Sequence, residues 1–189
     1  TIQYEYTDGV LSKETKYNVN GELALYYIYE YDNNGVILNR HGYNKSDKNN
    51  SILSYTYDDQ GRLIEERNSA ISTSTSSLGK VRSATRIVYT YDEQGRLNVE
   101  TNQEATAGKE GITDWTNGDK YIYYYEGTST QVSRKEIYQW STEKEKYDIH
   151  EHDDYTVSNR YGSEYVPQNI NITLRELTKS SSLRSVCSK

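Results

Sequence analysis

Hydrophobic and polar residues alternate with a period of two along most of the chain. In Tyr55-Thr56-Tyr57 and in Tyr89-Thr90-Tyr91, the aromatic rings lie two residues apart. In an extended chain such rings project from one face and the threonine projects from the other. No stretch shows a sustained helical period, which predicts few helices. The pattern therefore predicts an all-β chain.

A nine-residue pattern is repeated along the chain. Residues 55–63 recur almost unchanged as residues 89–97, and an altered copy occupies residues 29–37. In each copy, an Asp opens and a Gly closes a short polar stretch between two strand patterns. This arrangement is typical of a type I turn that ends on a left-handed residue. Asp8-Gly9 and Asn20-Gly21 predict tighter hairpins of the same kind.

The repeats indicate the architecture of the whole chain. We expect antiparallel hairpin repeats that form a strongly twisted sheet, partly wound or two-layered. The step from Gly61 to Gly95 is longer than the step from Gly35 to Gly61, and residues 68–83 are rich in Ser and Thr. This predicts an inserted mobile loop over 68–83, and a second polar insertion is expected over 102–120. A single domain over 1–178, its last strand at 168–177 after Pro167, and a flexible tail over 179–189 complete the prediction.

The motif Tyr-x-Tyr-Asp-x-x-Gly-Arg-Leu resembles the Tyr-Asp (YD) repeat of RHS-type bacterial cell-surface and secreted proteins. Residues 4 to about 140 carry the resemblance. Large members of that family wind many hairpins into a shell around a cargo, but this chain has too few copies to close one. Short chains of this type look like small secreted proteins of gut-type Gram-negative bacteria. The resemblance implies a bacterial protein of the extracellular space or cell envelope.

Composition changes what kind of core is expected. Only 33% of the residues are hydrophobic, and Phe and Met are absent, but the chain contains 21 Tyr. Each tyrosine ring can bury about 150–250 Å² while its hydroxyl keeps a polar partner. Tyrosine also favours strands. We therefore expect a thin, half-polar core made of tyrosine ladders.

Charge and cysteine usage limit the partners. The net charge of −6 without a basic cluster argues against nucleic acid as a partner. No apolar run is long enough to form a transmembrane segment. The single cysteine, Cys187, excludes an intrachain disulfide. The chain starts at Thr1 without Met, which fits a mature form whose export signal has been removed. Oligomeric state is left open.

Three aromatic residues are candidates for ligand binding. Tyr26 and Tyr124 fall on the strand face opposite to the repeat tyrosines, which are expected to serve as core. Trp115 lies outside the repeat, in a polar insertion. It either caps the edge of the sheet or stands exposed as an anchor for a partner.

One cluster has residue types found in metal sites. On a strand, His150, His152 and Asp154 would share a face and offer two imidazoles and a carboxylate. Glu151 and Asp153 occupy the intervening positions, so the whole segment also fits a solvated, charged edge strand that discourages aggregation. We predict no metal site and no cofactor.

No catalytic residues can be named. Adjacent acids such as Glu65-Glu66 point to opposite faces of a strand and cannot form a glycosidase pair. The sequence favours a non-enzymatic, exported surface or envelope module that binds a glycan or a protein. The alternatives are a purely structural spacer and, with less support, a hydrolase acting on carbohydrate.

Overall fold

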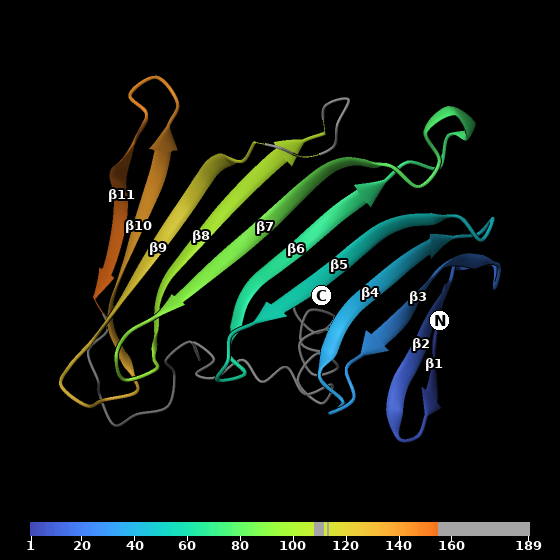
Figure 1. The fold of residues 1–189 in the computed structure, drawn as a ribbon, viewed down its shortest axis with the longest axis horizontal. Coiled ribbons are helices and arrows are strands. Elements are labelled where there is room, and N and C mark those ends of the chain that lie inside the picture. Colours follow the sequence, from blue (N-terminus) through green and yellow to red (C-terminus); the bar gives the residue numbers. More distant parts are fainter. Residues whose placement is uncertain (108–111, 113, 155–189) are drawn as a thin grey trace. The chain divides into compact units, whose positions relative to one another are not determined.

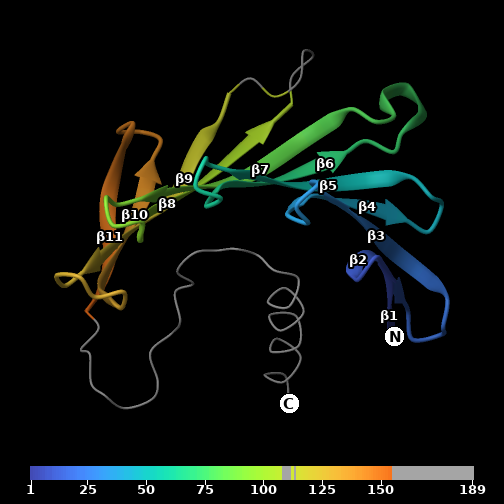
Figure 2. The ribbon, with the colours of Figure 1, turned by 60° about the horizontal axis from the view of Figure 1, so that its bottom comes forward.

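The computed structural model describes residues 1–107, 112 and 114–154. The expected last strand at 168–177 and the tail at 179–189, which includes Cys187, lie outside the described residues. Eleven strands and one short 3-10 helix make up the described part of the chain (Figures 1 and 2). Their bounds are β1 Ile2–Thr7, β2 Val10–Tyr17, β3 Leu23–Tyr31, β4 Ile37–Asn44, β5 Asn49–Tyr57, β6 Leu63–Ile71, η1 Thr75–Ser77, β7 Val81–Tyr91, β8 Leu97–Thr106, β9 Thr116–Tyr125, β10 Val132–Ser141 and β11 Lys146–Asp154.

The strands form one sheet in which each strand neighbours the next one along the chain, from β1 to β11. Pairing is antiparallel, as expected for hairpins joined in series. The all-β, antiparallel prediction is therefore confirmed. No helix in the described part of the chain combines the length and the apolar character needed to span a bilayer.

The described residues fall into two compact units. The first unit contains residues 1–55 and 68–82, and the second contains residues 56–67 and 83–154 apart from the undescribed positions. Strands β1 to β4 lie in the first unit, and β8 to β11 lie in the second.

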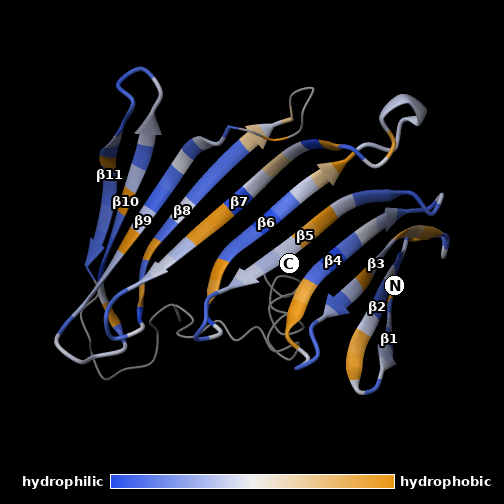
Figure 3. Ribbon diagram, viewed as in Figure 1, coloured by the Kyte–Doolittle hydropathy of each residue, from blue (hydrophilic) through white to orange (hydrophobic). Residues whose placement is uncertain are grey.

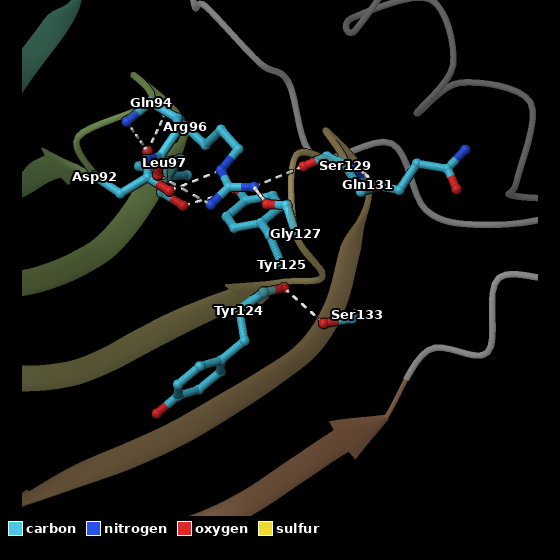
Figure 4. A network of polar contacts seen from close by, with 10 residues as sticks. All are labelled: Asp92, Gln94, Arg96, Leu97, Tyr124, Tyr125, Gly127, Ser129, Gln131 and Ser133. Carbon is cyan, nitrogen blue, oxygen red and sulfur yellow. Dashed lines mark hydrogen bonds and ion pairs between the residues drawn. The ribbon is translucent and has the colours of Figure 1, made fainter.

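The repeated turn has the geometry that the sequence predicts. At Asp58–Arg62, the amide of Gly61 donates to the carbonyl of Asp58 (2.9 Å), and Gly61 has a φ of 75°. The carboxylate of Asp58 accepts from the amides of Gln60 and Arg62, both at 2.9 Å. These bonds close a type I turn followed by a bulge. The turn at Asp92–Arg96 repeats them (Figure 4).

The same turn occurs where it was not predicted. At Asn18–Glu22 the amide of Asn18 donates to the carbonyl of Glu22, and the side chain of Asn18 takes the place of Asp. The prediction of a tighter hairpin at Asn20-Gly21 is therefore wrong. Asn44–Lys48 forms the turn as well, with Asp47 at φ 56° in the glycine position. Asp8-Gly9 is the tight two-residue hairpin that was expected, with φ of 51° and 83°.

Both predicted insertions are shorter than expected. Strand β6 continues to Ile71 and β7 begins at Val81, which leaves a connection of 72–80, with the 3-10 helix η1, instead of 68–83. Strand β8 continues to Thr106 and β9 begins at Thr116, which leaves a connection of 107–115 instead of 102–120. The polar composition misled the prediction because strands of a sheet with exposed faces accept Ser, Thr and Asn at those positions.

Two positions of the repeat supply much of the core. The hydrophobic residue after the turn is almost fully buried in each of four hairpins, namely Leu11, Ile37, Leu63 and Leu97. Figure 3 shows this hydrophobic colour at the start of β2, β4 and β6. The first tyrosine of the motif is buried at Tyr55, Tyr89 and Tyr123. The second tyrosines, Tyr57 and Tyr91, are only half-buried. The repeat tyrosines were expected to form the core, and this holds for the first tyrosine of the motif but not for the second.

The second tyrosine of the motif has a different role at Tyr91 and Tyr125, where it links one hairpin to the hairpin before it. Tyr91 Oη donates to the carbonyl of Leu63 (2.7 Å), and the guanidinium of Arg62 lies 4.5 Å from the centre of the Tyr91 ring. Tyr125 repeats the arrangement with the carbonyl of Leu97 (2.8 Å) and with Arg96 at 4.5 Å. We call this set of contacts the turn relay.

Changing Gly61 to Ala tests the turn. An added Cβ at Gly61 would meet nothing within 4 Å, so the cost comes only from forcing an L-residue into the left-handed region. We expect Gly61→Ala to lower the free energy of unfolding by about 1 kcal/mol, measured by urea denaturation. An unchanged midpoint would contradict the positive φ.

Changing Tyr91 to Phe tests the turn relay. The ring and its contact with Arg62 remain, and only the hydrogen bond to Leu63 is lost. We expect a loss of about 0.5–1.5 kcal/mol in unfolding free energy. Tyr6→Phe, at an exposed position with 60% of its surface free, serves as the control and should leave the stability unchanged. Equal effects of the two substitutions would disprove the relay.

Candidate functional site

Strands β9, β10 and β11 have two chemically different faces. On one face Tyr121, Tyr123 and Tyr125 alternate along β9, with Tyr123 buried. The next residue, Tyr124, points to the opposite face and is 40% exposed. Figure 4 shows the ring of Tyr125 beneath Arg96 and the ring of Tyr124 directed away from that network. Only the face of Tyr124 is free of the turn relay.

A buried carboxylate lies at the centre of the Tyr124 face. Glu136 of β10 is only 6% exposed and lies opposite Ile122 of β9. Its Oε2 accepts hydrogen bonds from the hydroxyls of Tyr124 and Tyr138, both at 2.7 Å. Its Oε1 forms an ion pair with Arg134. The carboxylate is thus held by two phenols and one guanidinium.

This arrangement fixes the protonation states of the cluster. The hydrogen bonds from Tyr124 and Tyr138 hold the pKa of Glu136 below its ordinary value, and the charge of Arg134 acts in the same direction. The hydrogen bond to Glu136 in turn raises the pKa of Tyr124 to about 12. At neutral pH the cluster therefore contains one carboxylate and two neutral phenols. A carboxylate whose pKa is lowered is a poor general acid.

More aromatic rings extend the same face. Lys120 of β9 lies opposite Tyr138, and its Nζ is 5.0 Å from the centre of that ring and 4.1 Å from the centre of the Tyr147 ring. Trp140 packs edge-on against Tyr147 at 4.9 Å. These distances are typical of cation–π and T-shaped aromatic contacts. We call Tyr124, Tyr138, Trp140 and Tyr147, with Lys120 and Glu136, the aromatic face.

Trp115 immediately precedes β9 and is half-buried. The guanidinium groups of Arg86 and Arg67 lie 4.1 and 5.4 Å from the centre of its ring. Arg86 is itself fixed by an ion pair with Glu65 (3.0 Å) and a hydrogen bond to Gln103 (2.7 Å). Trp115 therefore packs against two arginines of its own chain, and nothing in the described residues tests the expectation that it contacts a ligand.

Tyr26 belongs to the first unit and lies on the face opposite to Tyr27. Its ring stacks on that of Tyr43 at 4.9 Å with an interplanar angle of 5°. Its hydroxyl donates to Asp47 (3.2 Å), and Lys13 Nζ lies 5.3 Å from the ring centre. Tyr26 thus forms a small aromatic platform, separate from the aromatic face.

The structure does not assemble a metal site from His150, His152 and Asp154. The register shifts at this point of β11: Ile137 lies opposite Glu151 and Tyr138 opposite Ile149, so His150 has no opposite residue. Among the described residues, no group of three His, Cys, Asp or Glu side chains could hold a metal ion. Asp154 instead approaches Arg134, with 3.8 Å between Oδ1 and Nε.

The residues that organise the aromatic face were not predicted from the sequence. Arg134, Glu136, Tyr138 and Trp140 alternate along one strand, which is the available signal that they share a face. Their importance depends on Lys120 and Tyr147, which pair with β10 from both sides. Cross-strand neighbours of this kind become visible only when the strand register is known.

Comparison with known proteins adds little about function. No family model and no curated protein matches this chain. Solved structures that resemble it include a DUF3836 family protein from Bacteroides vulgatus, at 17% identity and a TM-score of 0.38 over 53% of this chain and 91% of that one. A protein of unknown function from Bacteroides fragilis has 13% identity and a TM-score of 0.40, over 83% and 92%. A DUF3836 family protein from Parabacteroides distasonis has 15% and 0.35, over 54% and 91%. With TM-scores below 0.5, these similarities carry no argument about what this chain does.

The aromatic face gives a pH-dependent prediction. Since the pKa of Glu136 is lower in the folded chain than its ordinary value of 4.5, its ionised form stabilises the fold above pH 4.5. That contribution is lost as the pH falls through the lowered pKa. We expect Glu136→Gln to be less stable than the parent at pH 7, with the difference shrinking below pH 4.5. Thermal melts across this range measure it, and a difference that is constant with pH would contradict the assignment.

Proposed function

We propose that the chain is a non-enzymatic binding module that contacts carbohydrate through the aromatic face. The observation that supports this most is the separation of the two faces of β9 to β11. One face is used for packing, whereas the other presents partly exposed rings of Tyr124, Tyr138, Trp140 and Tyr147 around a fixed carboxylate. Ligand sites combine such apolar and aromatic surface with a few placed polar groups. Sugar rings can stack on these aromatics while Arg134, which Glu136 holds in place and whose side chain is 44% exposed, donates to the sugar hydroxyls.

The distribution of carboxylates argues against a hydrolase. Burial raises the pKa of Glu100, which by itself suits a general acid. However, Glu100 lies opposite Tyr121 and accepts a hydrogen bond from Tyr123, so it is on the packing face. Glu136 is on the other face, and two carboxylates on opposite faces of a sheet cannot attack one glycosidic bond.

Export to the bacterial surface or envelope is part of the proposal. Its support is the resemblance to YD-repeat proteins in the motif that builds the turn relay. The relay uses the Tyr, Asp, Arg and Leu positions of that motif together, as at Asp92, Arg96, Leu97 and Tyr125.

A structural spacer is the second candidate. The observation that favours it is that the hydroxyls of Tyr124 and Tyr138 already have an internal partner in Glu136. In a spacer these rings only stabilise the sheet. A protein ligand on the same face is a third outcome that the experiment distinguishes.

The test compares the three aromatic candidates. The chain is screened on a glycan array, and hits are titrated by calorimetry with Tyr124→Ala, Tyr26→Ala and Trp115→Ala variants. We expect Tyr124→Ala to weaken binding about tenfold or more, equivalent to about 1.4 kcal/mol, and the other two to bind as the parent does. Tyr124→Phe, which keeps the ring, should retain most of the affinity.

Melting curves of each variant separate loss of binding from loss of fold. Weakening only by Tyr26→Ala or Trp115→Ala would move the site away from the aromatic face. If no glycan binds, and a protein is captured by the immobilised parent chain but not by the Tyr124→Ala variant, the ligand of the aromatic face is a protein and not a carbohydrate. No binding of either kind would favour the spacer.

A further inference from the structure

The outer edge of β1 is open among the described strands. β1 is first in the strand order and pairs only with β2. All six of its residues are exposed, and three of them are large and hydrophobic: Ile2 at 46%, Tyr4 at 41% and Tyr6 at 60%. An edge strand presents a row of free N–H and C=O groups that can pair with another strand.

The backbone of the same three residues faces outward. Thr1 and Tyr17 exchange two hydrogen bonds, with Tyr17 N to Thr1 O at 2.9 Å and Thr1 N to Tyr17 O at 3.3 Å. In an antiparallel ladder, successive residues direct their polar groups to opposite sides. Ile2 and Tyr4 therefore direct theirs away from β2.

The bulge in this hairpin does not disturb the outer edge. Glu5 lies opposite Lys13 and Tyr6 lies opposite Leu11, so the extra residue, Ser12, belongs to β2. Thr7 pairs with β2 next to the tight turn, and Tyr6 therefore directs its backbone outward as Tyr4 does. β1 remains a regular strand of six residues along its free side.

The two ends of the sheet differ in charge. β11 carries Glu151, Asp153 and Asp154 on an exposed strand, which is a common protection against strand pairing. β1 carries one charged side chain, Glu5, whose carboxylate is 3.1 Å from Lys13. β1 thus lacks the protection that β11 has.

We propose that β1 pairs with β1 of a second copy of this chain, antiparallel about a two-fold axis at Tyr4. This register places Tyr4 opposite Tyr4 of the copy and Ile2 opposite Tyr6. Gln3 then lies opposite Glu5, and its amide can donate to that carboxylate. No two like charges face each other, and an aromatic pair forms at the centre.

Pairing of β1 with β1 of a second copy is more favourable than a pairing that involves β11. Pairing of β11 with β11 would bring acidic strands together. Pairing of β1 with β11 would be head-to-tail and would build a ring or an open fibre of several chains, whereas the two-fold pairing of β1 closes after two chains. The pairing does not depend on the proposed carbohydrate site.

Sedimentation equilibrium over a series of concentrations tests the pairing. We expect the parent chain to reach twice the mass of one chain. Tyr4→Lys, which places two ammonium groups opposite each other and removes the aromatic pair, should raise the dimer dissociation constant about tenfold or more. The matched control is Ile149→Lys at an exposed position of β11 (56%), which should leave association unchanged.

Hydrogen exchange of the parent chain provides a second measurement that needs no variant. The amides of Ile2, Tyr4 and Tyr6 should exchange more slowly as the protein concentration rises. A chain that stays monomeric at all concentrations would overturn the proposal. So would a dimer that Tyr4→Lys leaves intact, or concentration-dependent protection confined to β11.

Discussion

The turn relay is the interaction on which the rest of the structure depends. The chain is only 33% hydrophobic, so ordinary apolar burial is limited. In the second unit, Arg62 pairs with Asp58 of its own turn at 2.7 Å and covers the ring of Tyr91 in the following hairpin. Tyr91 donates to the carbonyl of Leu63, directly after that arginine. The hairpins that carry Arg62 and Arg96 therefore shape their turns and anchor the next hairpin with the same residues.

The relay also stabilises the sheet although the chain offers few apolar atoms. The leucine after the arginine is buried, and its carbonyl, which would otherwise need another partner at the sheet surface, accepts from a tyrosine hydroxyl. A buried carbonyl without a partner would cost free energy. The arginine keeps its charge solvated on one side while its planar group rests on the aromatic ring. The tyrosine and arginine side chains thus cover the buried leucines, as a second apolar layer does in a β-sandwich.

Only one face of each strand takes part in the relay, and this leaves the other face free to differ between hairpins. In the first unit that face carries the stacked pair Tyr26 and Tyr43. In β9 to β11 it carries the aromatic face around Glu136. The proposed function follows from this division, because residues that packing does not constrain can serve a ligand.

The local part of the fold was predictable from the sequence. The turns at Gly61 and Gly95 were predicted because positive φ and a capping Asp leave a signature within five residues. The partners of the first tyrosines were not predicted. Tyr29 donates to Glu14 and Tyr123 to Glu100, each glutamate three residues after a buried leucine. The recurrence of Glu at that spacing was a visible signal, but its meaning requires knowing which strands are adjacent.

The misplaced loop boundaries have a common physical cause. The relay lies at the end of the strands where the Asp-Gly turns are found. In an antiparallel series the connection at 72–80, the end of β8 at Thr106 and the start of β9 at Thr116 lie at the opposite end. Extra residues at that opposite end can lengthen both strands of a hairpin without shifting the register at the relay. The longer step from Gly61 to Gly95 is therefore divided between a longer connection at 72–80 and longer strands β6 and β7, which run to Ile71 and from Val81. When the contacts that fix the strand register lie at one end of the strands, the length of the strands and connections can vary at the other end.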